Sequence, residues 1–345
     1  MDDLVVGGVT RYVMGRGIAA DAAVVLDGSP GQVAVFAQPG SASIARSLER
    51  AVAASGRQAA TRILPDGEGA KTLGVVEDAA GWLNSLGMTR SDHLVAVGGG
   101  ALTDAVGFLA SVYLRGVGVS YVATTLLGAV DASIGGKTAV NIGGKNLIGT
   151  FRHPDVVAVD IDILAALPED LLRQGMAETA KAGLIGDPGL VELLEQDGLG
   201  ADLEAVVQRS VRVKAAVVGR DFRETGERAH LNFGHTVGHA LESAAGWPHG
   251  DAVAVGMAAA ARASVIETGF AAEARILALL EGLRLPVVAP AGTLRSEIRS
   301  LMRLDKKRTG DGVRMVLLEE IGVPTVVEVA PATVASALDA IGVTE

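Results

Sequence analysis

The strongest constraint on the fold of this chain is a change of sequence pattern near residue 165. Over residues 1–160, short runs of β-branched residues alternate with stretches that have helical spacing of apolar residues. The run QVAVFA precedes the helical stretch SIARSLERAVAASG, and HLVAVGGG precedes ALTDAVGFLASVYLRG. Strands that alternate with helices predict a parallel sheet with crossover helices. The N-terminal half is therefore expected to be an α/β domain.

From Pro168 onward the pattern is almost continuously helical. Stretches such as DLLRQGMAETAKAGLIG, ADLEAVVQRSVRVKAAVV and DAVAVGMAAAARASVIETG repeat apolar residues at helical spacing. A chain of 345 residues is long enough for two domains of ordinary size. We therefore predict a parallel-sheet domain over residues 1–165 and a mostly α-helical domain over residues 166–345.

Charge and cysteine content exclude several classes of function. The net charge of −10 argues against nucleic acid or an anionic membrane as the main partner, because both attract cationic surfaces. The chain has no cysteine, which excludes disulfides, thiolate nucleophiles and thiolate metal ligands. No signal peptide or long apolar segment is evident. We expect a soluble cytoplasmic protein, and an anionic small substrate is not excluded because it needs only local positive charge.

Histidine is scarce and concentrated in one stretch, LNFGHTVGHALESAAGWPHGDAVAVGM. His235 and His239 are four residues apart, so a helix places them on one face, and His249 follows a predicted loop. This spacing suits zinc, but two histidines do not complete a zinc site. Glu178 in GMAETAK is the candidate carboxylate ligand. The alternative is that Glu178 forms only a surface ion pair with Lys181, one helical turn later.

Two glycine-rich segments are candidates for binding an anion. AVDASIGGKTAVNIGGKNLIGTF contains Asp131, Lys137, Lys145 and Asn146 among glycines, a composition that suits a phosphorylated ligand. In VGGGALTD, a predicted strand ends in glycines and a helix begins. The start of such a helix can bind a pyrophosphate, but a tight turn without a ligand explains the same pattern equally well.

Taken together, these motifs resemble the 3-dehydroquinate synthases of the sugar phosphate cyclase family. The segments GGGALTD, TTLLGAVDASIGGKT, GKNLIGTF, GMAETAK, LNFGHTVGHALE and PHGDAVAVGM occur in the family's order. The resemblance extends from PDGEGAKTL to LDKKRTGDGVRMVLLEEIG, which is nearly the whole chain. It implies a Rossmann-like NAD-binding domain, a helical metal- and substrate-binding domain, and a homodimer.

The resemblance also implies a reaction. The substrate would be 3-deoxy-D-arabino-heptulosonate 7-phosphate, and the products 3-dehydroquinate and phosphate, in the shikimate pathway. NAD would oxidise one ring alcohol transiently, phosphate would leave by β-elimination, and re-reduction would precede an intramolecular aldol closure. A divalent ion, Zn²⁺ or Co²⁺, would polarise the alcohol that is oxidised.

The resemblance assigns a role to each matching residue. The implied metal ligands are Glu178, His235 and His249. The implied NAD contacts are Glu68, Lys71, Gly99, Gly100, Asp104, Thr124 and Thr125. The implied substrate or catalytic residues are Asp131, Lys137, Lys145, Asn146, Lys181, Lys214, Arg228, Asn232, His239, Lys306 and Lys307, together with Arg115, which would reach the phosphate site of the neighbouring subunit.

The chain departs from the family pattern at a few positions. Lys145 follows Lys137 by eight residues, one fewer than is usual in the family. Gln38 stands where the family normally has an aspartate that binds the adenosine ribose, and Ala166 stands where threonine is common.

Several alternatives remain open at this point. A sister cyclase would act on an aminated analogue, on sedoheptulose 7-phosphate or on glucose 6-phosphate. A metal-dependent polyol dehydrogenase would release NADH, and a sensor would bind the sugar phosphate without turnover. Arg228 favours a carboxylated substrate, because a guanidinium pairs with a carboxylate through two hydrogen bonds. It lies one helical turn before Asn232 and two before His235, so we predict that all three share one helical face.

Overall fold

The computed structural model describes residues 2–29, 31–304 and 313–343. The chain divides into two compact units, residues 1–168 and 169–345. Among the described residues, no helix is both long enough and apolar enough to cross a membrane.

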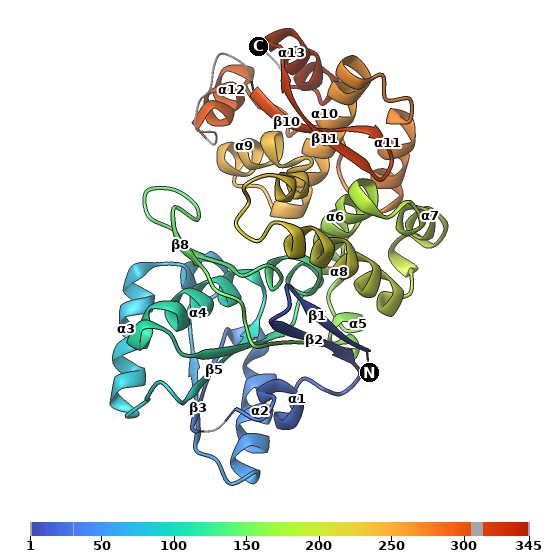
Figure 1. The fold of residues 1–345 in the computed structure, drawn as a ribbon. Coiled ribbons are helices and arrows are strands. Elements are labelled where there is room, and N and C mark those ends of the chain that lie inside the picture. Colours follow the sequence, from blue (N-terminus) through green and yellow to red (C-terminus); the bar gives the residue numbers. More distant parts are fainter. Residues whose placement is uncertain (1, 30, 305–312, 344–345) are drawn as a thin grey trace. The chain divides into compact units, whose positions relative to one another are not determined.

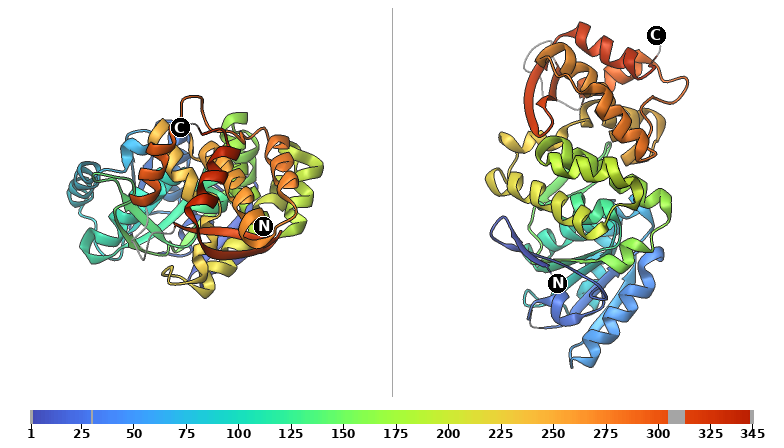
Figure 2. Two further views of the ribbon diagram at one scale, coloured as in Figure 1. Left: turned by 90° about the horizontal axis from the view of Figure 1, so that it is seen from above. Right: turned by 90° about the vertical axis from the view of Figure 1, so that its right-hand side faces the viewer.

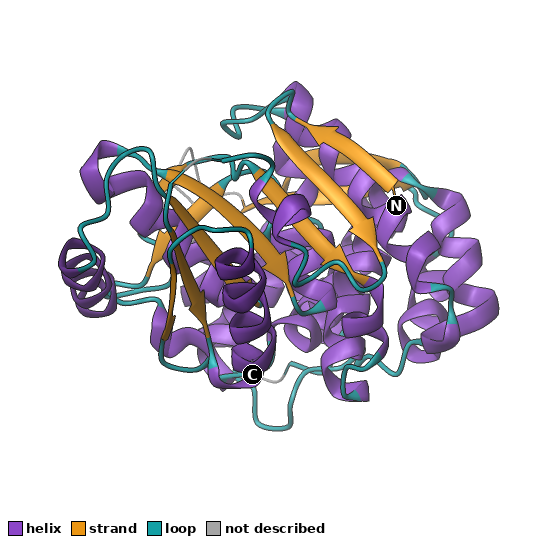
Figure 3. Ribbon diagram, turned by 90° about the horizontal axis from the view of Figure 1, so that it is seen from below, coloured by secondary structure: helices purple, strands orange, loops and turns teal. Residues whose placement is uncertain are grey.

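The N-terminal unit is built on a twisted seven-stranded sheet with the order β1-β2-β9-β6-β5-β3-β4, whose strands are orange in Figure 3. Neighbouring strands are parallel except for the antiparallel pair β1–β2. Strands β3, β5 and β9 are buried along their whole length, as expected when helices cover both faces of a parallel sheet. A separate antiparallel hairpin is formed by β7 and β8. The strands of the unit are β1 (Asp2–Val6), β2 (Thr10–Gly15), β3 (Val33–Ala37), β4 (Ala59–Ile63), β5 (His93–Gly98), β6 (Gly118–Ala123), β7 (Lys137–Val140), β8 (Ile148–Phe151) and β9 (Val156–Asp160).

Helices cover the sheet in the way that right-handed crossovers require. The connections β2–α1–β3 and β3–α2–β4 run in one direction across the sheet, while β4–α3–β5 and β5–α4–β6 run in the other. Crossovers of one hand therefore place α1 and α2 on one face and α3 and α4 on the other, in agreement with the contacts of α1 with α2 and of α3 with α4. The sequence prediction of an α/β, parallel-sheet fold is confirmed. The helices are α1 (Ala22–Leu26), α2 (Ala42–Ala54), α3 (Leu73–Ser85), α4 (Gly100–Val112) and α5 (Ile161–Ala165), with shorter helical turns η1 (Pro39–Ser41), η2 (Gly67–Ala70), η3 (Tyr113–Arg115) and η4 (Gly128–Ala132).

The strand order reverses at β3, which pairs with β4 on one side and β5 on the other. The chain leaves β3 and β5 in opposite directions, and open α/β sheets bind ligands beyond the carboxyl ends of the strands at such a point. Gln38 follows β3 there, and Gly99 follows β5.

The C-terminal unit is mostly helical, as predicted, and is organised around α10. Residues Gly250–Ala261 of this helix are buried almost throughout, and α6, α9, α13 and strand β10 pack against it. The antiparallel hairpin β10–β11, red in Figure 2, was not expected from the sequence. The elements are α6 (Glu169–Gly186), α7 (Pro188–Asp197), η5 (Gly198–Gly200), α8 (Leu203–Arg220), η6 (Glu227–Asn232), α9 (His235–Ala245), α10 (His249–Thr268), α11 (Glu273–Gly282), α12 (Arg295–Leu304), β10 (Val313–Glu320), β11 (Val323–Val329) and α13 (Pro331–Ala340).

Candidate functional site

Three potential metal ligands, here called the metal cluster, meet inside the C-terminal unit. They are Glu178 of α6, His235 at the start of α9 and His249 at the start of α10. Oε1 of Glu178 lies 3.1 Å from Nε2 of His249 and 3.4 Å from Nε2 of His235. Two ligands on neighbouring corners of a zinc tetrahedron, with bonds of about 2.0–2.2 Å, are about 3.3–3.6 Å apart. The spacing of these donors therefore fits a divalent ion.

Glycines at two helix crossings allow the metal cluster to form. A Cβ atom on Gly256 of α10 would lie 1.9 Å from the carbonyl oxygen of Gly234, and one on Gly238 of α9 would lie 2.9 Å from the backbone of α10. A Cβ atom on Gly250 of α10 would lie 2.4 Å from the carbonyl oxygen of Gln174 in α6. Since a side chain does not fit at these crossings, glycine is what lets α9 and α6 approach α10. The three ligand-bearing segments are thereby drawn together.

The surroundings of the metal cluster keep Glu178 ionised and His235 neutral. Glu178 is 2% exposed, and the ammonium group of Lys181 forms an ion pair with its Oε2. Burial alone would raise the pKa of Glu178, but Lys181 and the two histidines lower this pKa well below its usual range. Burial, and then Lys181, lower the pKa of His235 to about 3. A carboxylate and a neutral imidazole are the forms that bind a metal.

His249 is held between two carboxylates. Its Nε2 faces Glu178, and its Nδ1 lies 3.3 Å from Oε2 of Glu242. Burial would lower the pKa of His249, but the hydrogen bonds with Glu178 and Glu242 outweigh it and raise this pKa to about 10. In the absence of a metal a proton thus lies between Glu178 and His249, and metal binding would release it.

Glu242 was not found by sequence reasoning. The available signal was its place two helical turns after His235, on the same face of α9. His239, one turn after His235, also lies beside the cluster: its ring centre is 5.0 Å from that of His235 and 6.3 Å from that of His249.

The predicted helical face that joins Arg228, Asn232 and His235 is wrong. The first two lie in η6, a separate 3₁₀ helix, and α9 begins only at His235. Gly234 separates the two helices with a left-handed φ of 80°, a conformation that breaks the helical path. Arg228 is 2% exposed and donates from Nη1 to the carbonyl oxygen of Phe222.

The remaining predicted residues of this unit are found in different surroundings. Lys181 and Lys214 are buried, at 3% and 8% exposure. The alternative of a surface ion pair between Glu178 and Lys181 is therefore wrong. Asn232 donates from Nδ2 to Oε1 of Glu224 at 3.0 Å. Lys306 and Lys307 lie outside the described residues.

In the N-terminal unit, several predicted NAD contacts lie at the carboxyl ends of β5 and β6. Gly99 precedes the first turn of α4, which begins at Gly100. The backbone N–H of Thr124 donates to the carbonyl oxygen of Gly98 at 3.0 Å, and a Cβ atom on Gly99 would lie 3.2 Å from Cγ2 of Thr125. No side chain caps this helix start, and such a start offers backbone N–H groups to a phosphate.

Four other predicted residues are joined by hydrogen bonds near this helix. The ammonium group of Lys71, which is 4% exposed, donates to Oδ2 of Asp104 at 2.7 Å and to Oδ1 of Asn146 at 2.5 Å. Glu68 accepts a hydrogen bond of 2.7 Å from Nδ2 of Asn141, a residue that sequence reasoning did not single out. Asn141 directly follows β7, in the loop where the chain is one residue shorter than usual for the resembling family.

The other predicted residues of this unit lie in irregular segments. Asp131 lies in the single π-helical turn η4, Lys137 begins β7, and Lys145 lies in the loop between β7 and β8. Arg115 ends η3 with a left-handed φ of 68°.

Gln38 has a structural partner where the family has its ribose aspartate. Its Nε2 donates to the carbonyl oxygens of Pro65 and Gly67, at 2.8 Å and 3.0 Å. The side chain therefore fixes the segment that leads to Glu68.

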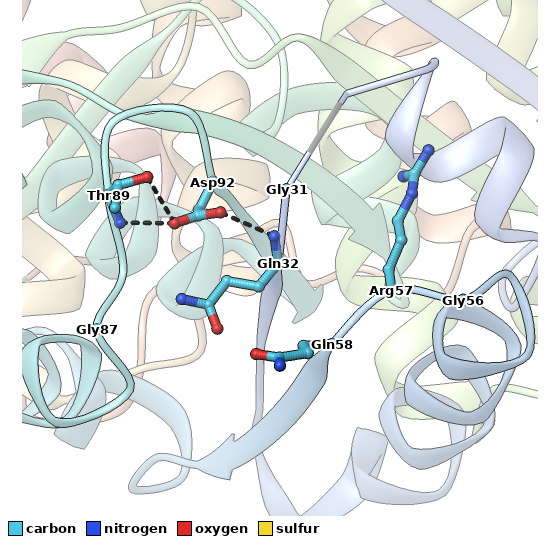
Figure 4. A pocket seen from close by; sticks show the side chains of 8 residues that line it. All are labelled: Gly31, Gln32, Gly56, Arg57, Gln58, Gly87, Thr89 and Asp92. Atoms are coloured by element: carbon cyan, nitrogen blue, oxygen red, sulfur yellow. Dashed lines mark hydrogen bonds between the residues drawn. The ribbon is translucent and has the colours of Figure 1, made fainter.

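A hollow of about 470 Å³ lies elsewhere on the unit, at the amino ends of β3, β4 and β5 (Figure 4). Asp92 at its wall accepts hydrogen bonds from Thr89 and from the backbone N–H of Gln32. Parallel sheets bind ligands at their carboxyl ends, and none of the predicted site residues lines this hollow. We do not assign it to the reaction.

Comparison with known proteins connects these features. The model for the family "3-dehydroquinate synthase N-terminal" matches residues 61–174, and that for "3-dehydroquinate synthase C-terminal" matches residues 175–308. The chain belongs to the 3-dehydroquinate synthase family. A 3-dehydroquinate synthase from Acidithiobacillus ferrooxidans (strain ATCC 53993 / BNL-5-31) is 42% identical to it over 343 residues, which cover 94% of this chain and 93% of that protein.

Solved structures show the same fold in sister cyclases. A 2-epi-5-epi-valiolone synthase from Streptomyces hygroscopicus subsp. jinggangensis 5008, with NAD⁺ and Zn²⁺ bound, superposes with a TM-score of 0.87 at 26% identity, covering 96% of each chain. A 2-deoxy-scyllo-inosose synthase complexed with carbaglucose-6-phosphate, NAD⁺ and Co²⁺ gives the same TM-score and identity, covering 95% of this chain and 96% of that one. Two findings assign this chain to the 3-dehydroquinate synthase family and not to these cyclases. Both family models match it, and relatives in that family are more identical to it in sequence, at 42% compared with 26%.

Proposed function

We propose that this chain converts 3-deoxy-D-arabino-heptulosonate 7-phosphate to 3-dehydroquinate and phosphate, with the metal cluster as its metal site. It is a phosphate-eliminating cyclase, a lyase of the shikimate pathway. The observation that carries the assignment of the site is the meeting of Glu178, His235 and His249 at metal-ligand spacing in a chain of this family. The aminated analogue, the other cyclase substrates and polyol dehydrogenation are less favoured, because relatives such as that of A. ferrooxidans are 3-dehydroquinate synthases.

The cofactors are NAD and a divalent metal, Zn²⁺ or Co²⁺, in line with the sister cyclases. When bound, NAD supplies a transient oxidation of the substrate alcohol, and the metal supplies a Lewis acid beside that alcohol. Glu178, His235 and His249 would hold the metal. Glu242 would accept the Nδ1–H of His249 and so leave Nε2 free to bind the metal.

Buried cations would hold the anionic substrate in the C-terminal unit. Lys181 and Lys214 have little exposure to water, so their attraction for a phosphorylated acid is weakly screened. Arg228 would pair with the substrate carboxylate, since its planar guanidinium can make two parallel hydrogen bonds. His239, Asn232, Lys306 and Lys307 would complete the contacts with substrate.

The N-terminal unit would bind NAD. The start of α4 would receive the pyrophosphate, because no side chain caps its backbone N–H groups. Glu68, Lys71, Asp104, Thr124 and Thr125 would contact the rest of the cofactor. Asp131, Lys137, Lys145 and Asn146 would contact the substrate.

We also propose that the protein is a cytoplasmic homodimer in which Arg115 reaches the phosphate site of the neighbouring subunit. The support is the resemblance of YLRG to the family motif and the defined left-handed backbone at Arg115. Light scattering on the purified protein tests the dimer. If the dimer forms, Arg115→Ala subunits are then mixed with His235→Ala subunits. We expect the mixture to regain part of the activity, because the intact arginine of one subunit would serve the intact metal site of the other. No regain would show that each site uses its own arginine.

The proposed reaction is tested by its stoichiometry. Purified protein with the divalent metal, a small amount of NAD and the heptulosonate phosphate should release one equivalent of phosphate per substrate consumed, with no build-up of absorbance from NADH. Accumulation of NADH in proportion to substrate would instead identify a dehydrogenase. Release of phosphate from sedoheptulose 7-phosphate at an equal rate would identify a sister cyclase.

A further inference from the structure

A closed ring of hydrogen bonds ties the loop after β7 to Lys71. The backbone N–H of Asn141 donates to the carbonyl oxygen of Lys71 at 2.8 Å. The backbone N–H of Asn146 donates to Oδ1 of Asn141 at 2.9 Å. The ring closes where the ammonium group of Lys71 donates to Oδ1 of Asn146 at 2.5 Å. We call these three residues the amide ring.

The amide ring is connected to two further side chains that we propose contact NAD. Nδ2 of Asn141 donates to Oε2 of Glu68 at 2.7 Å, and the ammonium group of Lys71 donates to Oδ2 of Asp104 at 2.7 Å. Asn141 therefore bonds with Glu68 in η2 and with Lys71, which directly follows η2. Through Asn146 it also bonds with the loop that carries Lys145. Of the residues in this network, Asn141 is the one whose role was not suggested by the sequence.

With Glu68 and Asn146 as its neighbours, the side chain at position 141 has to donate one hydrogen bond and accept another. The side chain of Asn141 donates to Glu68 and accepts from Asn146 at the same time, which a carboxylate or an apolar side chain cannot do. The four residues between the two asparagines include Gly143 and Gly144, which impose little conformation of their own. Asn146 has a left-handed φ of 57°, which the hydrogen bonds at both of its ends hold in place.

We infer that Asn141 is a positioning residue that holds the loop bearing Lys145 and Asn146 against Glu68 and Lys71, and so sets the affinity of this edge for phosphate-bearing ligands. The inference rests on the proposed function, in which these four neighbours contact NAD and the sugar phosphate. Asn141 itself acts through them. Its backbone N–H bond to Lys71 survives substitution, so a variant loses the side-chain links and keeps the β7–β8 hairpin.

The first experiment is the Asn141→Ala variant, measured by NAD titration calorimetry, steady-state kinetics and melting temperature. Loss of a hydrogen bond to a charged group predicts a Kd for NAD and a KM for the sugar phosphate about tenfold higher, with kcat changed less than about threefold. Hydrogen exchange at the amide of Asn146 should become faster. Asn84→Ala, at an exposed position on α3, is the matched control and should behave like the wild type.

A donor–acceptor exchange makes the test sharper. Asn141→Asp places a second carboxylate against Glu68 and should weaken NAD binding further than the alanine variant. Adding Glu68→Gln provides an amide that can donate to the new carboxylate at position 141, while that carboxylate still accepts from Asn146. The double variant should therefore bind NAD more tightly than Asn141→Asp alone, a rescue that a merely structural defect would not show.

The outcomes separate this inference from the proposed function. If the wild type binds NAD and releases phosphate, but Asn141→Ala matches it in Kd, KM and exchange at Asn146, the inference is overturned and the function stands. Glu68→Gln is also measured alone, and changes in the free energy of NAD binding that simply add in the double variant would likewise overturn it. If the wild type binds no NAD, the proposed function fails first.

Discussion

The metal cluster and the amide ring are built in opposite ways. The metal cluster consists of side chains on three helices, and its central carboxylate has a side chain that is 1% exposed. In the amide ring, Asn146 lies in a segment whose residues 142–149 are exposed, Asn141 is half-buried and Lys71 is buried, and hydrogen bonds alone hold the three residues together. One site is fixed by helix packing, and the other is fixed by hydrogen bonds between an exposed loop and a buried lysine.

This difference predicts how each site responds to mutation. Removing one member of a buried charged group leaves its partners unpaired in a medium of low dielectric constant, which costs much more free energy than losing a surface contact. Changes near the metal cluster should therefore abolish metal binding or turnover. Changes in the amide ring should shift affinities by modest factors.

The largest effect short of removing a ligand is expected at the buried Arg228. Arg228→Ala should raise KM for the heptulosonate phosphate by an amount equivalent to about 2–5 kcal/mol, because the proposed desolvated pair with the substrate carboxylate is lost. Arg228→Lys should recover only part, since an ammonium cannot reproduce the planar geometry. Kinetics with the exposed Arg223→Ala variant provide the control. An unchanged KM in Arg228→Ala would remove Arg228 from the proposed site.

Helix packing around the metal cluster can be tested at Gly256. Gly256→Ala places a Cβ atom 1.9 Å from the carbonyl oxygen of Gly234, so α9 must move. Overpacking of this kind should lower the free energy of unfolding by about 1–3 kcal/mol and weaken metal binding with it. Gly219→Ala on α8 is the matched control, because no heavy atom lies within 4 Å of its Cβ position. Chemical denaturation that ranks the control as the less stable variant would contradict this account.

A smaller effect is expected at Glu242. Glu242→Ala removes the carboxylate that orients His249 through Nδ1, and loss of such a partner typically weakens metal binding about 10–100-fold. Glu242→Gln, which keeps an oxygen acceptor, should lose less. Competition with a chelator of known affinity measures both variants. Equal affinity in the wild type and Glu242→Ala would show that helix packing alone orients His249.

The smallest expected effect is on stability and concerns His93, at the amino end of β5 in the N-terminal unit. Burial lowers the pKa of His93 to about 4, with Asp155 opposing the shift and Arg152 and Arg57 adding to it, and the ring nitrogen Nε2 bonds with Ser120 at 2.8 Å.

The unfolded chain has the higher histidine pKa, so it binds the extra proton as the pH falls from about 6.5 toward 4. Above about pH 6.5, His93 therefore makes its full contribution to the free energy of unfolding. This contribution is lost as the pH falls from about 6.5 toward 4. His93→Gln should remove about 1 kcal/mol of the stability difference between about pH 7 and pH 5.5. Chemical denaturation at the two pH values measures the free energy of unfolding. If this free energy changed with pH by the same amount in the wild type and in His93→Gln, the account of His93 would be contradicted.

The sheet was predictable because its strands are runs of β-branched residues separated by helical stretches, as in QVAVFA and HLVAVGGG. The hairpin β10–β11 was missed because the buried run of β10, residues 315–318, is too short for its pattern to distinguish a strand from a helix. The break at Gly234 was missed because the helical spacing of polar residues continues through it, while a left-handed glycine is invisible to such spacing.

Spacing in the sequence made Glu178, His235 and His249 candidate metal ligands, but only the resemblance favoured this role of Glu178 over a surface ion pair. Glu178 and Lys181 have the spacing of an ordinary surface ion pair, and only the structure, in which α10 packs against α6 and α9 against α10, reveals that both are buried. Glu242 and Asn141 act on neighbours that are distant in sequence or lie across a loop, so no local motif marks them.

The most direct test of the account is the metal content of the His235→Ala variant. The wild type should carry about one divalent ion per chain, as a site with three protein ligands does. His235→Ala should lose the ion and the release of phosphate together, while His230→Ala, a histidine outside the metal cluster, should keep both. A His235→Ala protein that retains one ion per chain and full activity would show that Glu178, His235 and His249 are not the metal site.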